Sequence, residues 1–221
     1  MILLLGDIHG DSRILEKAIE VAKESNATAI VQLGDFGMYF DNEVWFRQDV
    51  ADAHIPIYFI DGNHDNCTKW ITYDSVTRIW DDRTLYYVPR GTVMELDGRT
   101  IAFMGGAGSI DKNIRLERKM HWDINENIGE EHIANLYKNI EGKKIDMLLT
   151  HCPPNSVINE HFDPAQKLWF GVGIDWQDPN QDIIEDIWKK LDYVPVYSGH
   201  MHKKIIGMTY RILNINELLA V

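Results

Sequence analysis

Short apolar runs alternate with helix-like patterns along the first sixty residues of the chain. Residues 2–5, 29–33 and 57–60 are apolar runs of strand length, and we expect each to form a buried strand. Between the first two runs, one apolar stripe repeats with helical spacing, at Ile14, Leu15, Ala18, Ile19 and Ala22. The residues around 43–53 suggest a second helix. This alternation predicts an α/β fold.

The rest of the chain carries further signals for strands and helices. Asp97-Gly98 lies between apolar runs at 92–96 and 100–104, an arrangement typical of a two-residue β-hairpin. We expect helices over 130–139 and 183–191, and strands over 147–149, 194–197 and 203–215. The stretch 152–180 shows little periodicity, and we expect a long functional loop there. No repeat or linker divides the sequence, so one domain over residues 1–221 is the simplest interpretation.

Composition and charge narrow the class of protein. A length of 221 residues suffices for one domain with a substantial core. The proportions of 45% hydrophobic and 25% charged residues exclude a largely disordered chain. There are 22 Lys and Arg against 34 Asp and Glu, which gives a formal net charge of −12. Such acidity argues against a long nucleic-acid duplex as partner, because duplex phosphates require a basic surface.

Two features bear on the compartment. The two cysteines, Cys67 and Cys152, leave no disulfide framework, as expected in a reducing cytoplasm. The apolar start of the sequence lacks the basic region of a signal peptide, and no apolar run reaches the length of a membrane span. We therefore expect a cytoplasmic protein without a membrane partner.

The polar side chains with the clearest chemistry lie in five short patches, and several of these patches follow an expected strand. Five of the nine histidines fall within them. The patches are Gly6-Asp7-Ile8-His9-Gly10, Gly34-Asp35, Gly62-Asn63-His64-Asp65, Thr150-His151 and Gly199-His200-Met201-His202. Ligands of open α/β sheets gather at the carboxyl ends of the strands. Asp, Asn and His offer oxygen and nitrogen lone pairs to divalent metals, so the patches predict a dinuclear metal site.

The spacing within the patches suggests how two ions would be shared. Side chains alternate along an extended segment, so Asp7 and His9 point to the same side. Asp35 stands alone in its patch and suits a bridging carboxylate, while Asn63 supplies a neutral oxygen. A water between two such ions would lose its proton near neutral pH and become a nucleophile.

The order of these motifs resembles the calcineurin-like metallophosphoesterase family, in its bacterial or phage type. The match runs from Asp7 to His202. The resemblance implies two mixed β-sheets packed as a sandwich flanked by helices, a four-layer α/β/β/α arrangement. It implies a first metal held by Asp7, His9, Asp35 and His202. It implies a second metal held by Asp35, Asn63, His151 and His200.

The same resemblance assigns roles around the substrate. His64 is expected to contact the phosphate, together with Asn63, and to help the leaving group depart. Asp65 is expected to orient His64, so that His64 and Asp65 are the candidate catalytic residues. One departure is informative, because protein Ser/Thr phosphatases of this superfamily carry Asp-Arg-Gly where this chain has Asp35-Phe36-Gly37. The substrate-binding arginine of that branch is therefore missing.

We accordingly expect a dinuclear-metal-dependent phosphoesterase that hydrolyses small phosphodiesters or nucleotides through a metal-bridging hydroxide. The alternatives are a phosphomonoesterase or protein Ser/Thr phosphatase, and a non-catalytic metal-binding scaffold. Two divalent ions are expected, Mn²⁺ above all, with Fe, Zn, Ni or Co as alternatives, because mixed oxygen and nitrogen ligands do not select soft ions.

Three other groups of residues admit a structural interpretation. The basic run of Lys112, Arg115, Arg118 and Lys119 is expected to be a solvated helix face, although one of its arginines could meet a phosphate. The aromatic residues Trp169, Phe170 and Trp176 are expected to cover the edge of the core, with stacking on a base as the alternative. Among the remaining histidines, His161 is a candidate for substrate contact, while His54, His121 and His132 are expected to be structural.

Overall fold

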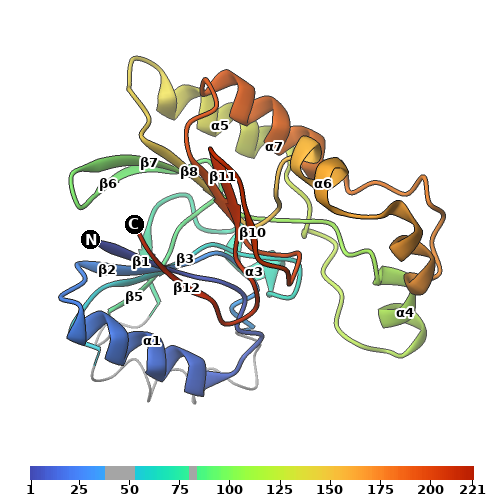
Figure 1. Ribbon diagram of the computed structural model, residues 1–221, viewed down its shortest axis with the longest axis horizontal. Coiled ribbons are helices and arrows are strands. Elements are labelled where there is room, and N and C mark those ends of the chain that lie inside the picture. The colour runs from blue at the N-terminus through green and yellow to red at the C-terminus, as the bar shows by residue number, and fades with distance from the viewer. Residues whose placement is uncertain (38–52, 80–83) are drawn as a thin grey trace.

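A computed structural model describes residues 1–37, 53–79 and 84–221 (Figure 1). The described residues form two six-stranded mixed sheets, which confirms the predicted fold class. The helix expected around 43–53 falls, apart from Ala53, outside the described residues.

The first sheet has the strand order β12-β1-β2-β3-β5-β4. Its strands are β1 (Ile2–Leu5), β2 (Ala29–Gln32), β3 (Ile57–Phe59), β4 (Thr77–Arg78), β5 (Leu85–Tyr87) and β12 (Leu218–Ala220). β1, β2, β3 and β5 run parallel, whereas β12 and β4 are antiparallel edge strands. The predicted β-α-β pattern is confirmed, with β1 joined to β2 through helix α1 (Ser12–Glu24) and with Asp11 as the N-cap.

The second sheet repeats this plan in the order β10-β11-β9-β8-β7-β6. Its strands are β6 (Val93–Leu96), β7 (Arg99–Met104), β8 (Met147–Thr150), β9 (Val196–Ser198), β10 (Ile205–Ile206) and β11 (Tyr210–Ile212). β7, β8, β9 and β11 are parallel, and antiparallel strands close both edges. The hairpin predicted at Asp97-Gly98 joins β6 to β7, with Asp97 at φ 53° and Gly98 at φ 73°, as a turn with two left-handed residues requires.

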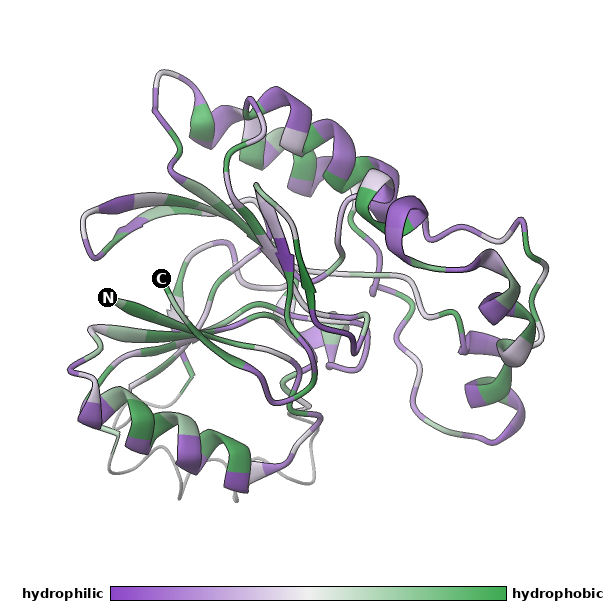
Figure 2. Ribbon diagram, in the orientation of Figure 1, coloured by the Kyte–Doolittle hydropathy of each residue, from purple (hydrophilic) through white to green (hydrophobic). Residues whose placement is uncertain are grey.

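Alternating side chains explain why the two sheets stack between helices. Ile2 and Leu4 face the core between the sheets, whereas Leu3 and Leu5 pack under α1. The second sheet buries its outer face against α5 (Glu130–Ile140) and α7 (Pro179–Lys190), so helices cover both outer faces (Figure 1). In Figure 2 the central strands of the first sheet are mostly hydrophobic, while α1 alternates hydrophobic and hydrophilic residues as an amphipathic helix does.

The expected loop over 152–180 is wrong in part, because it contains two helices. These are α6 (Asn155–His161) and the 3₁₀ helix η1 (Pro164–Phe170), and α7 begins at Pro179. Proline fits the first turn of a helix, and here it marks helix starts in a stretch with too few turns to show periodicity. The short helices α3 (Cys67–Trp70) and α4 (Lys112–Glu117) complete the described elements. None of the described helices has both the length and the apolar character needed to cross a bilayer.

Candidate metal centre

All five patches lie at the carboxyl ends of parallel strands. Asp7 follows β1, Asp35 follows β2 and Asn63 follows β3, while His151 and His200 follow β8 and β9 of the other sheet. Because both sheets present these ends on the same side, residues as far apart in the sequence as Asp7 and His200 meet. The structure groups Asp7, His9, Asp35 and His202 in one set of potential ligands, and Asp35, His151 and His200 in another.

The local backbone is strained at this edge. Four of the site residues have left-handed conformations, namely His9 at φ 46°, Asp35 at φ 55°, His200 at φ 70° and His202 at φ 48°. Such conformations cost energy in non-glycine residues and collect at functional sites. A glycine allows the backbone before His200 to lie against Asp7, because a Cβ at Gly199 would collide with the side chain of Asp7.

The first set converges on a small volume. The Nε2 atoms of His9 and His202 lie 2.8 Å apart, and Nε2 of His202 lies 3.2 Å from Oδ2 of Asp7. Nε2 of His9 lies 3.9 Å from Oδ2 of Asp35. Two imidazole nitrogens that face two carboxylates in this way form a donor set suited to a divalent cation of intermediate hardness.

The second set is buried more deeply. Nε2 of His151 lies 3.3 Å from Oδ1 of Asp35 and 3.2 Å from Oδ1 of Asn63. Nδ1 of His151 lies 2.7 Å from the carbonyl oxygen of Leu33, to which it donates. Histidines that bind metals commonly use one ring nitrogen as ligand while the other donates to a carbonyl or carboxylate. His151 therefore has the orientation expected of a ligand.

Asp35 belongs to both sets, and one of its carboxylate oxygens is free to bind a further ligand. Its side chain is 1% exposed, and its Oδ1 accepts a 2.7 Å hydrogen bond from the backbone N–H of His64. Its Oδ2 is buried and has no hydrogen-bond partner within the described part of the chain. A buried carboxylate oxygen without a partner is costly, and cations shared between the two sets would remove that cost. The residues present thus fit divalent metal ions, and Asp35 is common to both donor sets.

The close approach of Asp35 and His151 shifts the pKa values of both side chains. Burial by itself raises the pKa of Asp35, but the neighbouring His151 outweighs burial and holds this pKa well below its usual range. Burial likewise lowers the pKa of His151, yet the carboxylate of Asp35 raises it to about 10. In the metal-free protein the imidazolium of His151 therefore compensates Asp35, in the place that a cation would take.

His64 lies beside the first set but has an unexpected partner. Its ring packs edge-on against His9, with centroids 5.0 Å apart. Its Nδ1 accepts a hydrogen bond from Nη2 of Arg115, which is 2% exposed. The expectation of a solvated basic helix face is therefore wrong for Arg115. The guanidinium also donates to Oγ of Ser109 at 2.9 Å and to the backbone oxygen of Asn63 at 3.3 Å.

Asp65, expected to orient His64, makes its hydrogen bonds to the backbone and not to the imidazole ring. The carboxylate of Asp65 accepts backbone N–H groups from Gly37 at 2.6 Å, Gly62 at 2.8 Å and Phe36 at 3.2 Å. Burial raises the pKa of Asp65, as does the charge of Asp35, while these backbone donors oppose the shift. Asp65 thus ties together the turns that carry Asp35 and His64, and it acts on the ring only through the backbone.

Asp178 is a further buried acid near the centre, and the sequence analysis did not single it out. Its Oδ2 lies 3.9 Å from Nε2 of His200 and accepts the backbone N–H of Gly108 at 2.9 Å. Its position before Pro179 signals a helix N-cap, which it is, and nothing in the sequence connects it with His200. A carboxylate behind a ring nitrogen is the usual outer partner of a metal-binding histidine.

The remaining sequence candidates have different surroundings. The expectation that Trp169 covers the core edge is wrong, because its side chain is 79% exposed. It lines a cavity of about 490 Å³ that continues from Asp35, Asn63 and His64. His161 instead bonds Tyr210, with 2.8 Å between Nε2 and Oη.

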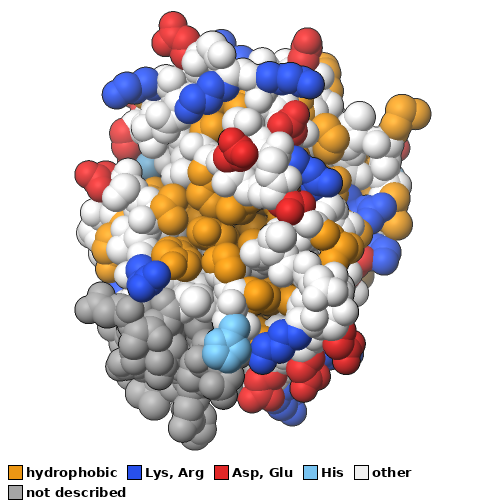
Figure 3. Space-filling view, turned by 90° about the vertical axis from the view of Figure 1, so that its left-hand side faces the viewer, with side chains coloured by type: hydrophobic (Ala, Val, Ile, Leu, Met, Phe, Trp, Pro, Cys, Tyr) orange, Lys and Arg blue, Asp and Glu red, His pale blue; other side chains and the backbone are white. Residues whose placement is uncertain are grey.

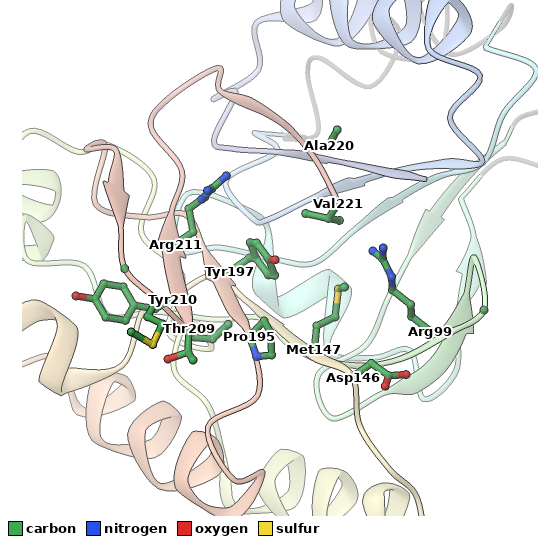
Figure 4. Close-up of a pocket in the computed structure, with 14 residues that line it drawn as sticks. Arg99, Asp146, Met147, Pro195, Tyr197, Thr209, Tyr210, Arg211, Ala220 and Val221 are labelled. Atoms are coloured by element: carbon green, nitrogen blue, oxygen red, sulfur yellow. The ribbon is translucent and has the colours of Figure 1, made fainter.

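A second cavity, of about 570 Å³, lies at the opposite edge of the sandwich (Figure 4). Met147 and Tyr210, at the amino ends of β8 and β11, contribute to its wall, and Arg99 and Arg211 stand on opposite sides of it. Figure 3 shows this end of the molecule, where apolar side chains gather in the middle of the face between the sheets. None of the predicted site residues lines this cavity.

Comparison with solved structures supports the fold. A crystal structure of TT1561 of Thermus thermophilus is similar with a TM-score of 0.58 and 15% identity, covering 97% of this chain and 89% of that chain. A second crystal structure is similar with a TM-score of 0.55 and 11% identity, covering 96% of this chain and 89% of that chain. At such identities the likeness concerns the fold alone.

Comparison of the sequence with known families is decisive for the class of protein. No curated protein matches the sequence. The family model described as calcineurin-like phosphoesterase matches residues 1–204, the span that contains all five patches. The chain therefore belongs to the calcineurin-like phosphoesterases, a family of metal-dependent phosphoric ester hydrolases.

Proposed function

We propose that the protein hydrolyses small phosphodiesters or nucleotides with two divalent metal ions, Mn²⁺ being the most effective. The observation that carries this proposal is Asp35, a buried carboxylate common to two convergent donor sets, with Oδ2 unpartnered among the described residues. A single ion would not require two donor sets that share one carboxylate. A net charge of −12 supports a small substrate over a long duplex.

The distances support the ligand sets that the family resemblance implies. Asp7, His9, Asp35 and His202 would hold one ion, and Asp35, Asn63, His151 and His200 the other. When bound, such a pair neutralises phosphate charge and activates the attacking water. Asp178 would orient the ring of His200 through its Nε2, and the carbonyl of Leu33 orients the ring of His151.

His64 is proposed to donate a hydrogen bond to the substrate, and Arg115 to fix which ring nitrogen donates. A guanidinium has only donors, so Nδ1 of His64 must accept and the proton of the neutral ring sits on Nε2. Burial, supported by Arg115 and opposed by Asp35, lowers the pKa of His64 to about 4. The ring then stabilises developing charge on a phosphoryl oxygen as a neutral donor, and it need not release a proton.

The preference for diesters rests on the distribution of arginines. A doubly charged phosphomonoester is held best by arginine forks, and the arginine expected after Asp35 is absent. Arg115, a buried arginine beside the centre, is engaged by His64, Ser109 and the backbone of Asn63. A diester carries one charge less and needs fewer cationic partners.

The test compares ester types on one preparation. Purified protein loaded with Mn²⁺ should give a higher kcat/KM on bis(nitrophenyl) phosphate or a cyclic nucleotide than on a phosphopeptide at neutral pH. Much faster hydrolysis of phosphopeptides than of every diester would contradict the proposal and favour a protein phosphatase.

A further inference from the structure

The cavity beside the metal centre has two chemically different ends. One end is lined by Asp35, Asn63 and His64, together with His200 and His202. The other end is built by α6, η1 and Trp176, in the segment that extends beyond the sheets in Figure 1. A volume of about 490 Å³ is within the usual range for a small-molecule site, roughly 300–1,000 Å³. A phosphate at the first end would place the rest of its ester in the second.

The wall of the second end is aromatic and open. Trp169 is 79% exposed and Phe170 is 37% exposed, and both line the cavity with Phe162 and Trp176. Large aromatic side chains seldom remain so exposed, and planar ligands stack on them. This wall favours a flat, uncharged group over a second phosphate. The lysine in the lining, Lys167, already donates from Nζ to the backbone oxygen of Ile174 at 3.2 Å.

Gln181 adds a polar group to this apolar end. It is 8% exposed and lines the cavity, and it is not one of the described residues whose buried polar atoms lack a partner, so its amide is open to the cavity. Gln181 is the third residue of α7, where glutamine often returns to the N-cap backbone, but here Asp178 caps the helix through Asn180. A side-chain amide that faces a cavity can pair with a ligand that offers it both a donor and an acceptor.

We propose that this end of the cavity is a base-binding subsite, which takes the nucleobase of a nucleotide ester whose phosphate lies at the metal centre. Trp169 and its aromatic neighbours supply the stacking surface. Gln181 reads the edge of the base, since an amide pairs with an adjacent donor and acceptor such as those of adenine. The inference rests on the proposed phosphoesterase function and narrows its substrates to nucleotides.

Equilibrium binding of adenosine monophosphate, the product expected from a nucleoside diester, tests the subsite directly. Calorimetric titrations of the Mn²⁺-loaded full chain use adenosine monophosphate and, in a parallel series, inorganic phosphate. Trp169→Ala and Gln181→Leu should each weaken the binding of adenosine monophosphate by about 10-fold, the scale of one lost base contact, and leave phosphate binding unchanged. Leu168→Ala is the matched control, because Leu168 is 58% exposed on the same helix and lies outside the cavity lining.

Kinetics separate this inference from the proposed function. Methyl nitrophenyl phosphate and the nitrophenyl ester of adenosine monophosphate share a leaving group, and the two variants should raise KM only for the nucleoside ester. If the enzyme hydrolyses both esters and the variants bind adenosine monophosphate as the wild type does, the subsite is refuted while the phosphoesterase stands. If no diester is hydrolysed but the two variants still bind adenosine monophosphate more weakly than the wild type does, the subsite stands without the proposed reaction.

Discussion

Two cavities lie at opposite edges of the sandwich, and they differ in chemistry more than in size. The cavity at the amino edge measures about 570 Å³ and the one at the carboxyl edge about 490 Å³. The carboxyl edge carries both sets of potential metal ligands found among the described residues. It also carries left-handed backbone at His9, Asp35 and His200 and a buried oxygen without a partner in the described part of the chain. Convergent donors and stored strain, rather than volume, identify the site.

The largest expected effect follows from Asp35→Asn. The substitution removes the charge that both ligand sets share, so both ions should be bound more weakly. Loss of several kcal/mol of metal-based stabilisation corresponds to a fall in kcat/KM on bis(nitrophenyl) phosphate of about 10³-fold or more. Steady-state kinetics with elemental analysis of the same samples measures this. Arg211→Met at the amino edge is the control and should leave kcat/KM and the metal content unchanged. An equal fall of both in this variant would contradict the assignment of the metal site to the carboxyl edge.

A smaller effect is expected for His64→Ala, which removes a donor but no ligand. Both ions should remain, and kcat should fall by about 10²-fold to 10³-fold, the usual loss for one transition-state hydrogen bond. The loss should be similar for nitrophenolate and for poorer leaving groups, because a neutral donor to a phosphoryl oxygen does not protonate the leaving group. A loss confined to poor leaving groups would show instead that His64 acts as an acid.

Arg115→Met should have a moderate effect through His64. Releasing Nδ1 lets the ring turn away from its productive position, and misplacement of this kind costs up to about 10²-fold in kcat. Because Arg115 acts through the ring, the same substitution in a His64→Ala background should cause no further loss, as a double-mutant cycle measures. Additive losses in the cycle would mean that Arg115 contacts the substrate or supports the fold independently of His64.

The smallest graded effect concerns pH. The carboxylate of Asp35 raises the pKa of His151 to about 10, so this imidazole is protonated in the metal-free protein at neutral pH. A ligand nitrogen must lose its proton, so metal affinity should rise with pH between about 6 and 8, by up to about 10-fold per unit for one released proton. The charged pair stabilises the metal-free protein fully below the unfolded pKa of His, and this contribution fades as pH rises through the folded value. Calorimetry in buffers of different protonation enthalpy counts the protons, and pH-independent affinity would contradict the assignment.

The convergence of the five patches could be predicted because simple rules place them at one edge. β1, β2 and β3 each end at a patch, and the carboxyl ends of parallel strands meet, so Asp7, Asp35 and Asn63 had to approach one another. His151 and His200 follow from the same rule in the second sheet. The fold class, the hairpin at Asp97-Gly98 and the helix α1 could also be predicted from the sequence, because long periodic segments and turn residues are local signals.

The side chains that surround the candidate ligands could not be predicted from the sequence. Arg115 stands in a basic run on a helix of six residues, too short for an apolar stripe, and only tertiary packing brings it to His64, 51 positions away. Asp178 looked like a helix cap, and its proximity to His200 depends on how α7 docks on the second sheet. Trp169 looked like a core residue because hydrophobicity alone does not distinguish a buried aromatic side chain from one that lines a cavity.

Titration of metal-free protein with Mn²⁺, followed by both elemental analysis and activity on bis(nitrophenyl) phosphate, tests the central claim most directly. If Asp35 joins two ligand sets, activity should rise until two ions are bound per chain and then level off. In Asp35→Asn no plateau at two ions should appear over the same range of concentration. Full activity of the wild-type protein with one bound ion, or with none, would contradict the dinuclear centre.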